Sequence, residues 1–120
     1  EYVYESRAAV GSGVHGNLLL DQGALEAPTA VALTNAVPTA SKSVLLQGYF
    51  ATSAAANALQ AGRIKGNSGT DYDCVTLVGR STVPGSGQLR IAPLSSRNVY
   101  YNVQTNATDT MSIWVAGFTY

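Results

Sequence analysis

The chain has little of what disulfide, metal or membrane chemistry needs. It contains one cysteine, Cys74, so no disulfide can form within it. It also contains one histidine, and one Cys with one His cannot complete a zinc site. No apolar run approaches the roughly 20 residues of a membrane-spanning helix. We therefore expect no cofactor, no metal and no membrane insertion.

Charge is scarce as well. Lys and Arg number 7, Asp and Glu number 7, and together they are 12% of the residues, about half the usual share of a soluble domain. Binding to nucleic acid needs a clustered basic surface, so we expect no nucleic-acid partner. A charge-poor surface is found where other subunits cover a domain, and also where Ala, Ser, Thr and Gly face water. The composition leaves these two alternatives open.

The length of 120 residues fits one domain. The sequence begins at Glu1 rather than at Met. We therefore expect residues 1–120 to form a single domain that has been processed or is the C-terminal part of a longer chain.

Short β-type segments are present throughout the chain. Apolar or alternating residues lie between turn-forming Gly, Pro, Asn and Ser clusters that are commonly about ten residues apart, a spacing typical of a sandwich or barrel. The predicted strands cover residues 2–4, 18–20, 29–37, 43–50, 73–80, 88–92, 98–105 and 111–120. Residues 18–20 could also be one helical turn, because so short an apolar run has no diagnostic periodicity. About eight strands in two packed sheets is the jelly-roll arrangement. The fold class is therefore all-β, a single antiparallel β-sandwich of jelly-roll type.

Residues 51–61 allow two interpretations. Their alanines favour a helix of about two turns, with Ser53 as its N-cap and Gly62 as its stop. Such a short helix is marginal without packing support. The alternative is a loop followed by a strand over residues 58–65, which we favour because the surrounding segments are β.

Two segments share one order of residue types and we expect both to be central strands. Residues 43–49 and 112–118 each read Ser, three large apolar residues, a spacer, Gly and an aromatic residue. Alternate residues of 111–120 are apolar on both faces, although an antiparallel sandwich strand normally has one wet face. The second cover could be a partner subunit or residues 51–61 of the same chain. We favour the partner subunit, since little chain remains for a third layer. The expected interface residues are Leu45, Tyr49, Ile113, Val115 and Gly117. Gly48 and Gly117 predict a bulge or the close approach of another backbone.

Candidate functional residues are few. Two sets of residues could bind a sugar. The first has two carboxylates beside an aromatic ring, at Asp71, Tyr72 and Asp73. The second has planar polar groups beside another ring, at Arg97, Asn98 and Tyr100. Calcium needs six or more oxygen ligands, which no loop of this sequence supplies. His15 lies between Gly-rich turns, and no Gly-x-Ser-x-Gly motif supports a catalytic triad. We therefore do not expect an enzyme, and we expect Cys74 to be a small buried residue.

The C-terminal third resembles a known architecture. Ile-Ala-Pro-Leu-Ser-Ser-Arg-Asn-Val-Tyr-Tyr-Asn-Val at residues 91–103, followed by Met-Ser-Ile-Trp-Val-Ala-Gly-Phe-Thr-Tyr at residues 111–120, resembles the end of bacteriophage tail- and head-fibre jelly-roll tips. Residues 111–120 are also similar to the last strand of trimeric jelly rolls of the complement and tumour-necrosis-factor type. No binding-site motif of these families is present in the chain.

The resemblance implies a homotrimer in the virion or outside the cell, in contact with other virion proteins. It implies a fibre or spike tip that attaches to a host glycan or receptor. The alternatives are a capsid decoration protein that binds no sugar, and a bacterial carbohydrate-binding domain.

Overall fold

The described chain is built of β-strands. The structure, a computed structural model, describes residues 2–4, 6–34, 36–55, 58–66, 74–92 and 97–120. These residues contain no helix, and so none long and apolar enough to cross a membrane. The strands are β1 (Tyr2–Val3), β2 (Leu18–Gly23), β3 (Thr29–Ala32), β4 (Ser43–Thr52), β5 (Gln60–Lys65), β6 (Cys74–Gly79), β7 (Gly85–Ile91), β8 (Asn98–Val103) and β9 (Asp109–Thr119). The all-β prediction is confirmed.

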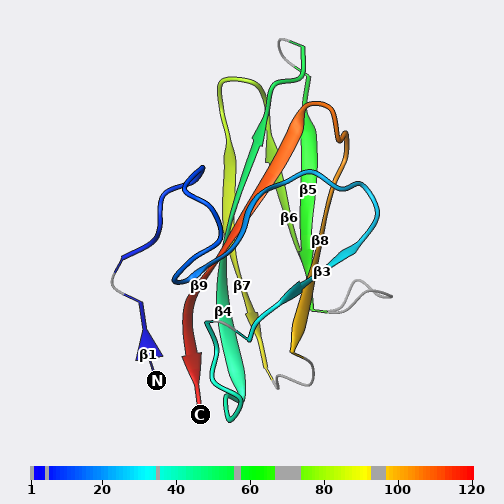
Figure 1. Cartoon of the computed structure of the whole chain (residues 1–120). Coiled ribbons are helices and arrows are strands. Elements are labelled where there is room, and N and C mark those ends of the chain that lie inside the picture. The colour runs from blue at the N-terminus through cyan, green and yellow to red at the C-terminus, as the bar shows by residue number, and fades with distance from the viewer. Residues whose placement is uncertain (1, 5, 35, 56–57, 67–73, 93–96) are drawn as a thin grey trace.

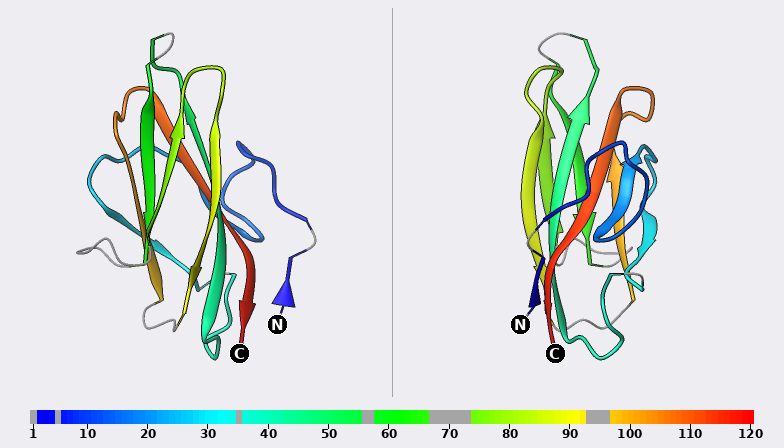
Figure 2. Two further views of the ribbon diagram at one scale, coloured as in Figure 1. Left: turned by 180° about the vertical axis from the view of Figure 1, so that it is seen from behind. Right: turned by 60° about the vertical axis from the view of Figure 1, so that its left-hand side comes forward.

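The strands form two sheets that face each other (Figures 1 and 2). The first, here called the β9 sheet, has the order β1-β9-β4-β7, and β2 also pairs with β9. The second, the β8 sheet, has the order β3-β8-β5-β6. All pairings are antiparallel. The two segments of matching residue order are β4 and β9, which pair with each other from Ser43 opposite Thr119 to Thr52 opposite Asp109. Both are central strands, as predicted.

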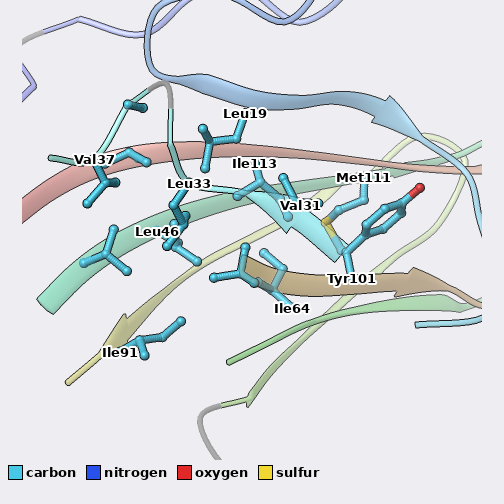
Figure 3. Close-up of a cluster of buried hydrophobic side chains, with 14 of the residues drawn as sticks. Leu19, Val31, Leu33, Val37, Leu46, Ile64, Ile91, Tyr101, Met111 and Ile113 are labelled. Carbon is cyan, nitrogen blue, oxygen red and sulfur yellow. The ribbon is translucent and has the colours of Figure 1, made fainter. Parts of the chain in front are cut away.

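The core lies between the two sheets, where alternate residues of each strand meet (Figure 3). Leu46 and Phe50 on β4 and Ile64 on β5 are fully buried there, and each such side chain contributes roughly 1.5–3 kcal/mol through its burial. Gly48 lies on the same face of β4, and a Cβ at this position would be 2.5 Å from Ile64 Cδ1 and 2.8 Å from Leu77 Cδ1. Gly48 therefore makes room for side chains of the opposite sheet, not for another backbone.

Strand β9 is buried on both faces by its own chain. Ile113 and Val115 are fully buried in the core between the sheets. On the other face, Trp114 is only 6% exposed, because the segment before β2 crosses it. The Trp114 Nε1–H donates to the carbonyl oxygen of Ala8 at 2.8 Å, and the Arg7 guanidinium carbon lies 5.8 Å from the centroid of the indole ring.

Further hydrogen bonds fix this N-terminal segment in place. The Val115 N–H donates to the Asn17 carbonyl oxygen at 2.8 Å. In return, Asn17 Nδ2 donates to the carbonyl oxygens of Val115 at 3.1 Å and Ser6 at 3.2 Å. The expected lack of chain for a third layer was therefore wrong. Residues 6–17 form that layer, and neither a partner nor residues 51–61 is needed to cover Trp114.

Gly117 was predicted to mark a bulge or the close approach of another backbone, and the structure has both features there. The β4–β9 register shifts between Leu45 and Leu46, which lie opposite Gly117 and Val115, so that β9 carries one extra residue there. A Cβ on Gly117 would lie 2.6 Å from the carbonyl oxygen of Tyr2. The backbone that approaches Gly117 therefore belongs to β1 of the same chain.

Several predicted strand boundaries differ in the structure: β2 continues to Gly23, β4 continues to Thr52, and β8 ends at Val103. Strand β3 ends at Ala32, not at residue 37, because the N–H groups of Ala36 and Val37 turn back to the Leu33 carbonyl oxygen at 3.1 and 3.0 Å. Strand β7 begins at Gly85, inside the expected turn of residues 81–87, since the hairpin closes through Arg80 and Val83. Within 51–61, the described residues form the end of β4, a loop and the start of β5, as we favoured.

Candidate functional site

The outward face of the β8 sheet gathers an aromatic ring and several planar polar groups. Alternation along β8 sends Val99, Tyr101 and Val103 into the core. The residues between them are therefore on the opposite face of the sheet. These outward residues are Asn98, Tyr100 and Asn102, and all three are partly exposed.

The neighbouring strands decide what surrounds this row. In the register of the sheet, Tyr100 lies opposite Ala30 of β3 and Lys65 of β5. Asn102 lies opposite Arg63 of β5. The β3 side is therefore small and flat, whereas the β5 side carries long side chains with several N–H donors. A ring on a flat surface with donors at one side can hold the apolar face and the hydroxyls of a sugar together.

The structure brings together only part of the predicted sugar-binding set. Asn98 and Tyr100 share the outward face of β8, but Arg97 does not join them. Its guanidinium donates to the carbonyl oxygens of Val37 and, at 3.3 Å, Pro38, so it supports the connection between β3 and β4. Asp71, Tyr72 and Asp73 lie outside the described residues.

Three residues of this face were not among the candidate site residues, namely Asn102, Arg63 and Lys65. Arg63 and Lys65 are two apart on a predicted strand, which places them on one face. No local pattern indicates that this strand pairs with β8 and brings Arg63 and Lys65 beside the outward row of β8.

The expected interface residues lie in different places. Leu45 and Tyr49 face outward on β4 and are partly buried, with Arg90 and Ser86 of β7 opposite them. Ile113 and Val115, by contrast, have no exposed surface and contribute to the core. Gly117 is covered by β1. Three of the five residues are therefore packed within the chain and present no free surface to a partner in this conformation.

His15 has a hydroxyl neighbour, but the arrangement differs from a catalytic triad. His15 Nε2 lies 3.0 Å from the Ser12 hydroxyl oxygen. The Ser12 hydroxyl donates to the Ala9 carbonyl oxygen, so the imidazole can act only as the donor to Ser12. Asp21 accepts from the N–H groups of Gly11 at 2.8 Å and Gly13 at 2.7 Å and serves to hold the turn.

Other chemistry has little support among the described residues. They contain no group of three or more His, Cys, Asp or Glu side chains that could hold a metal ion. Cys74 is a free thiol at the start of β6, and it is partly exposed, not buried as expected. It lies opposite Lys65 on β6, which is the last strand of the β8 sheet among the described residues.

No protein-family model, curated protein or solved structure matches this chain.

Proposed function

We propose that this chain is a non-enzymatic adhesion module that binds a glycan on the outward face of its β8 sheet. The observation that carries the proposal is the placement of Tyr100 between Asn98 and Asn102 on that face, beside Ala30. The C–H groups on one face of a sugar ring would pack on the Tyr100 ring, because the face of an aromatic ring attracts weakly positive hydrogens. The amides of Asn98 and Asn102 would hydrogen bond to its hydroxyls.

The finer fold proposed is a jelly roll, and the strand order supports it. The antiparallel pairs β2–β9, β3–β8, β4–β7 and β5–β6 are nested one inside the next. Two sheets connected in this way are the arrangement of jelly-roll lectin and viral capsid domains. The resemblance of the C-terminal third to phage fibre tips favours a fibre or spike tip that attaches a virion to its host.

A homotrimer is proposed with its contact on the outward face of β4 and β7. Leu45 and Tyr49 supply apolar surface there. A hollow of about 250 Å³ lies between this face and the N-terminal segment, and Val3, Arg7 and Leu45 are among the residues that line it. Closed symmetry is the usual arrangement of identical subunits. Sedimentation equilibrium of the wild type and of Tyr49→Glu tests this contact: the expected results are a trimer and a monomer, and a monomeric wild type would refute it.

A glycan array tests the proposed function. The wild type should bind at least one glycan class, Tyr100→Ala should lose about tenfold or more in affinity, and Tyr100→Phe should keep most of it because the ring remains. Val83→Ala is the control, since Val83 is exposed in the turn between β6 and β7 and belongs to neither proposed surface. Absence of binding to every glycan, together with binding to phage capsids, would replace this proposal by the decoration role. Equal binding by Tyr100→Ala would show that the site lies elsewhere.

A further inference from the structure

Strand β1 and the end of β9 lie side by side (Figures 1 and 2). Four aromatic rings gather there. Tyr2 on β1 stacks on Phe118 of β9, with ring centroids 5.1 Å apart and an interplanar angle of 13°. Tyr4 meets Tyr2 edge to face at 5.1 Å. Tyr120 meets Phe118 in the same way at 5.8 Å. The cluster is only partly covered, because Tyr2 is 50% and Tyr120 69% exposed.

A cavity of about 330 Å³ lies against this cluster. Tyr2, Tyr4 and Phe118 line it on one side, and Thr34 and residues 36–38 line it on the other. Its volume is at the lower end of the roughly 300–1,000 Å³ range of small-molecule sites. It is therefore large enough for one ring-sized ligand.

The walls of the cavity are held by hydrogen bonds that do not depend on a ligand. The Tyr4 hydroxyl donates to the Ala36 carbonyl oxygen at 2.8 Å. The Arg97 guanidinium donates to the carbonyl oxygens of Val37 and Pro38. These bonds link Tyr4, which follows β1, and Arg97, which precedes β8, to the same connection between β3 and β4. Because the walls are fixed in this way, a ligand would lose little free energy in ordering them.

The chemistry of the lining selects among ligand classes. Among the described residues that line the cavity, none carries a charged side chain, so these residues offer no counter-charge to an anion or a cation. The rings of Tyr2 and Phe118 are parallel and packed on each other, whereas a cage for a quaternary ammonium needs ring faces around the ligand. Flat aromatic surface with the hydroxyls of Tyr2 and Thr34 suits a ligand with one apolar face and a polar rim.

We propose that this cavity is a binding site for a single neutral pyranose ring, stacked on the aromatic cluster. It is separate from the Tyr100 face, which is on the outer side of the β8 sheet, and does not depend on glycan binding there. Tyr2 is the residue to test, because its side chain is half exposed and its backbone pairing with β9 does not depend on the ring.

Saturation-transfer difference NMR tests the proposal with the methyl glycosides of glucose, galactose, mannose and N-acetylglucosamine, each in millimolar excess over the protein. At least one should receive saturation, strongest at the C–H groups of one ring face. Tyr2→Ala should weaken that binding about tenfold, and Tyr2→Phe should retain it. Val83→Ala, the control, should leave it unchanged, since Val83 is exposed in the turn between β6 and β7 and does not line the cavity.

Three results would overturn the proposal. The first is that none of the four glycosides receives saturation from the wild type. The second is equal saturation in Tyr2→Ala, provided that its thermal unfolding matches that of the wild type. The third is displacement of the glycoside by tetramethylammonium, which would assign the cavity to a cation instead.

Discussion

Replacement of Asp109 by alanine is expected to destabilise the protein by about 3–5 kcal/mol. Asp109 begins β9 and is 1% exposed. Its Oδ1 accepts hydrogen bonds from the hydroxyls of Thr52 at 2.6 Å and Thr108 at 3.0 Å. Its Oδ2 accepts from the Thr105 N–H at 2.9 Å. The carboxylate thus joins the β8–β9 turn to the end of β4.

The magnitude follows from these three bonds. A hydrogen bond to a charged group contributes about 1.5–3 kcal/mol, and the three share one carboxylate, so their sum overstates the total. Alanine leaves the buried Thr52 hydroxyl and the Thr105 N–H without this acceptor. At an unfolding entropy of about 2.1 cal/mol/K per residue, a loss of 3–5 kcal/mol lowers the melting temperature by roughly 12–20 °C. This is a large part of the roughly 5–15 kcal/mol that stabilises a domain.

Urea unfolding followed by Trp114 fluorescence measures the effect. Asp21→Ala is the matched control, because Asp21 also accepts two hydrogen bonds, from the exposed Gly11 and Gly13. Water can replace those bonds, so the control should lose about 1 kcal/mol or less. Two results would refute the argument that burial of the Asp109 carboxylate makes its hydrogen bonds strongly stabilising. One is a loss below about 1 kcal/mol in Asp109→Ala, and the other is an equal loss in both variants.

Three further predictions concern the N-terminal segment. Gly117→Ala places a Cβ 2.6 Å from the Tyr2 carbonyl oxygen, so β1 should leave β9. The Tyr4 N–H, which donates to the Ala116 carbonyl oxygen at 3.0 Å, should then lose its protection from hydrogen exchange. Retained protection would contradict this prediction. Trp114→Phe removes the donor to Ala8 and should cost at least about 1 kcal/mol. Urea unfolding followed by circular dichroism measures this loss, because the variant contains no Trp; no measurable loss would show that this bond contributes nothing. Burial, and secondarily the charge of Tyr2, raise the pKa of Tyr4 above 10.0. The folded protein therefore keeps a proton on Tyr4 that the unfolded chain releases. Tyr4 leaves the free energy of unfolding unchanged below about pH 10 and lowers it as the pH rises through the alkaline range. Tyr4→Phe should show a smaller fall in urea unfolding over that range, and an equal fall would contradict the assignment.

The parts of the fold that the sequence predicted are those with a local signal. Strands β4 and β9 combine β-branched, aromatic and leucine residues with Gly at matching positions, and strand propensity and pairing reinforce each other there. Residues 51–61 were harder, since helix propensity favoured the alternative. Tertiary pairing of β5 with β6 and β8 outweighed that propensity.

The parts that could not be predicted depend on contacts distant in sequence. The third layer over Trp114 is held by the carbonyl oxygen of Ala8 and by Asn17, and neither has a recognisable pattern in the sequence. The candidate site shows the same limit. Alternation placed Asn98 and Tyr100 on one face, but the strand register that brings Arg63 opposite Asn102 is set by the whole sheet. Arg97 is adjacent in sequence and yet supports a different loop.

The covering of β9 changes what its apolar faces imply about a partner. A strand that is apolar on both faces needs two covers, and here the sandwich core supplies one while residues 6–17 supply the other. The apolar pattern of β9 is therefore not by itself evidence for oligomerisation. What remains for a partner on the β9 sheet is the outward surface of β4 and β7, where Leu45 and Tyr49 are only partly covered. A subunit contact at that place would lie beside the N-terminal segment rather than replace it, so Tyr49→Glu should separate subunits and leave Trp114 fluorescence unchanged.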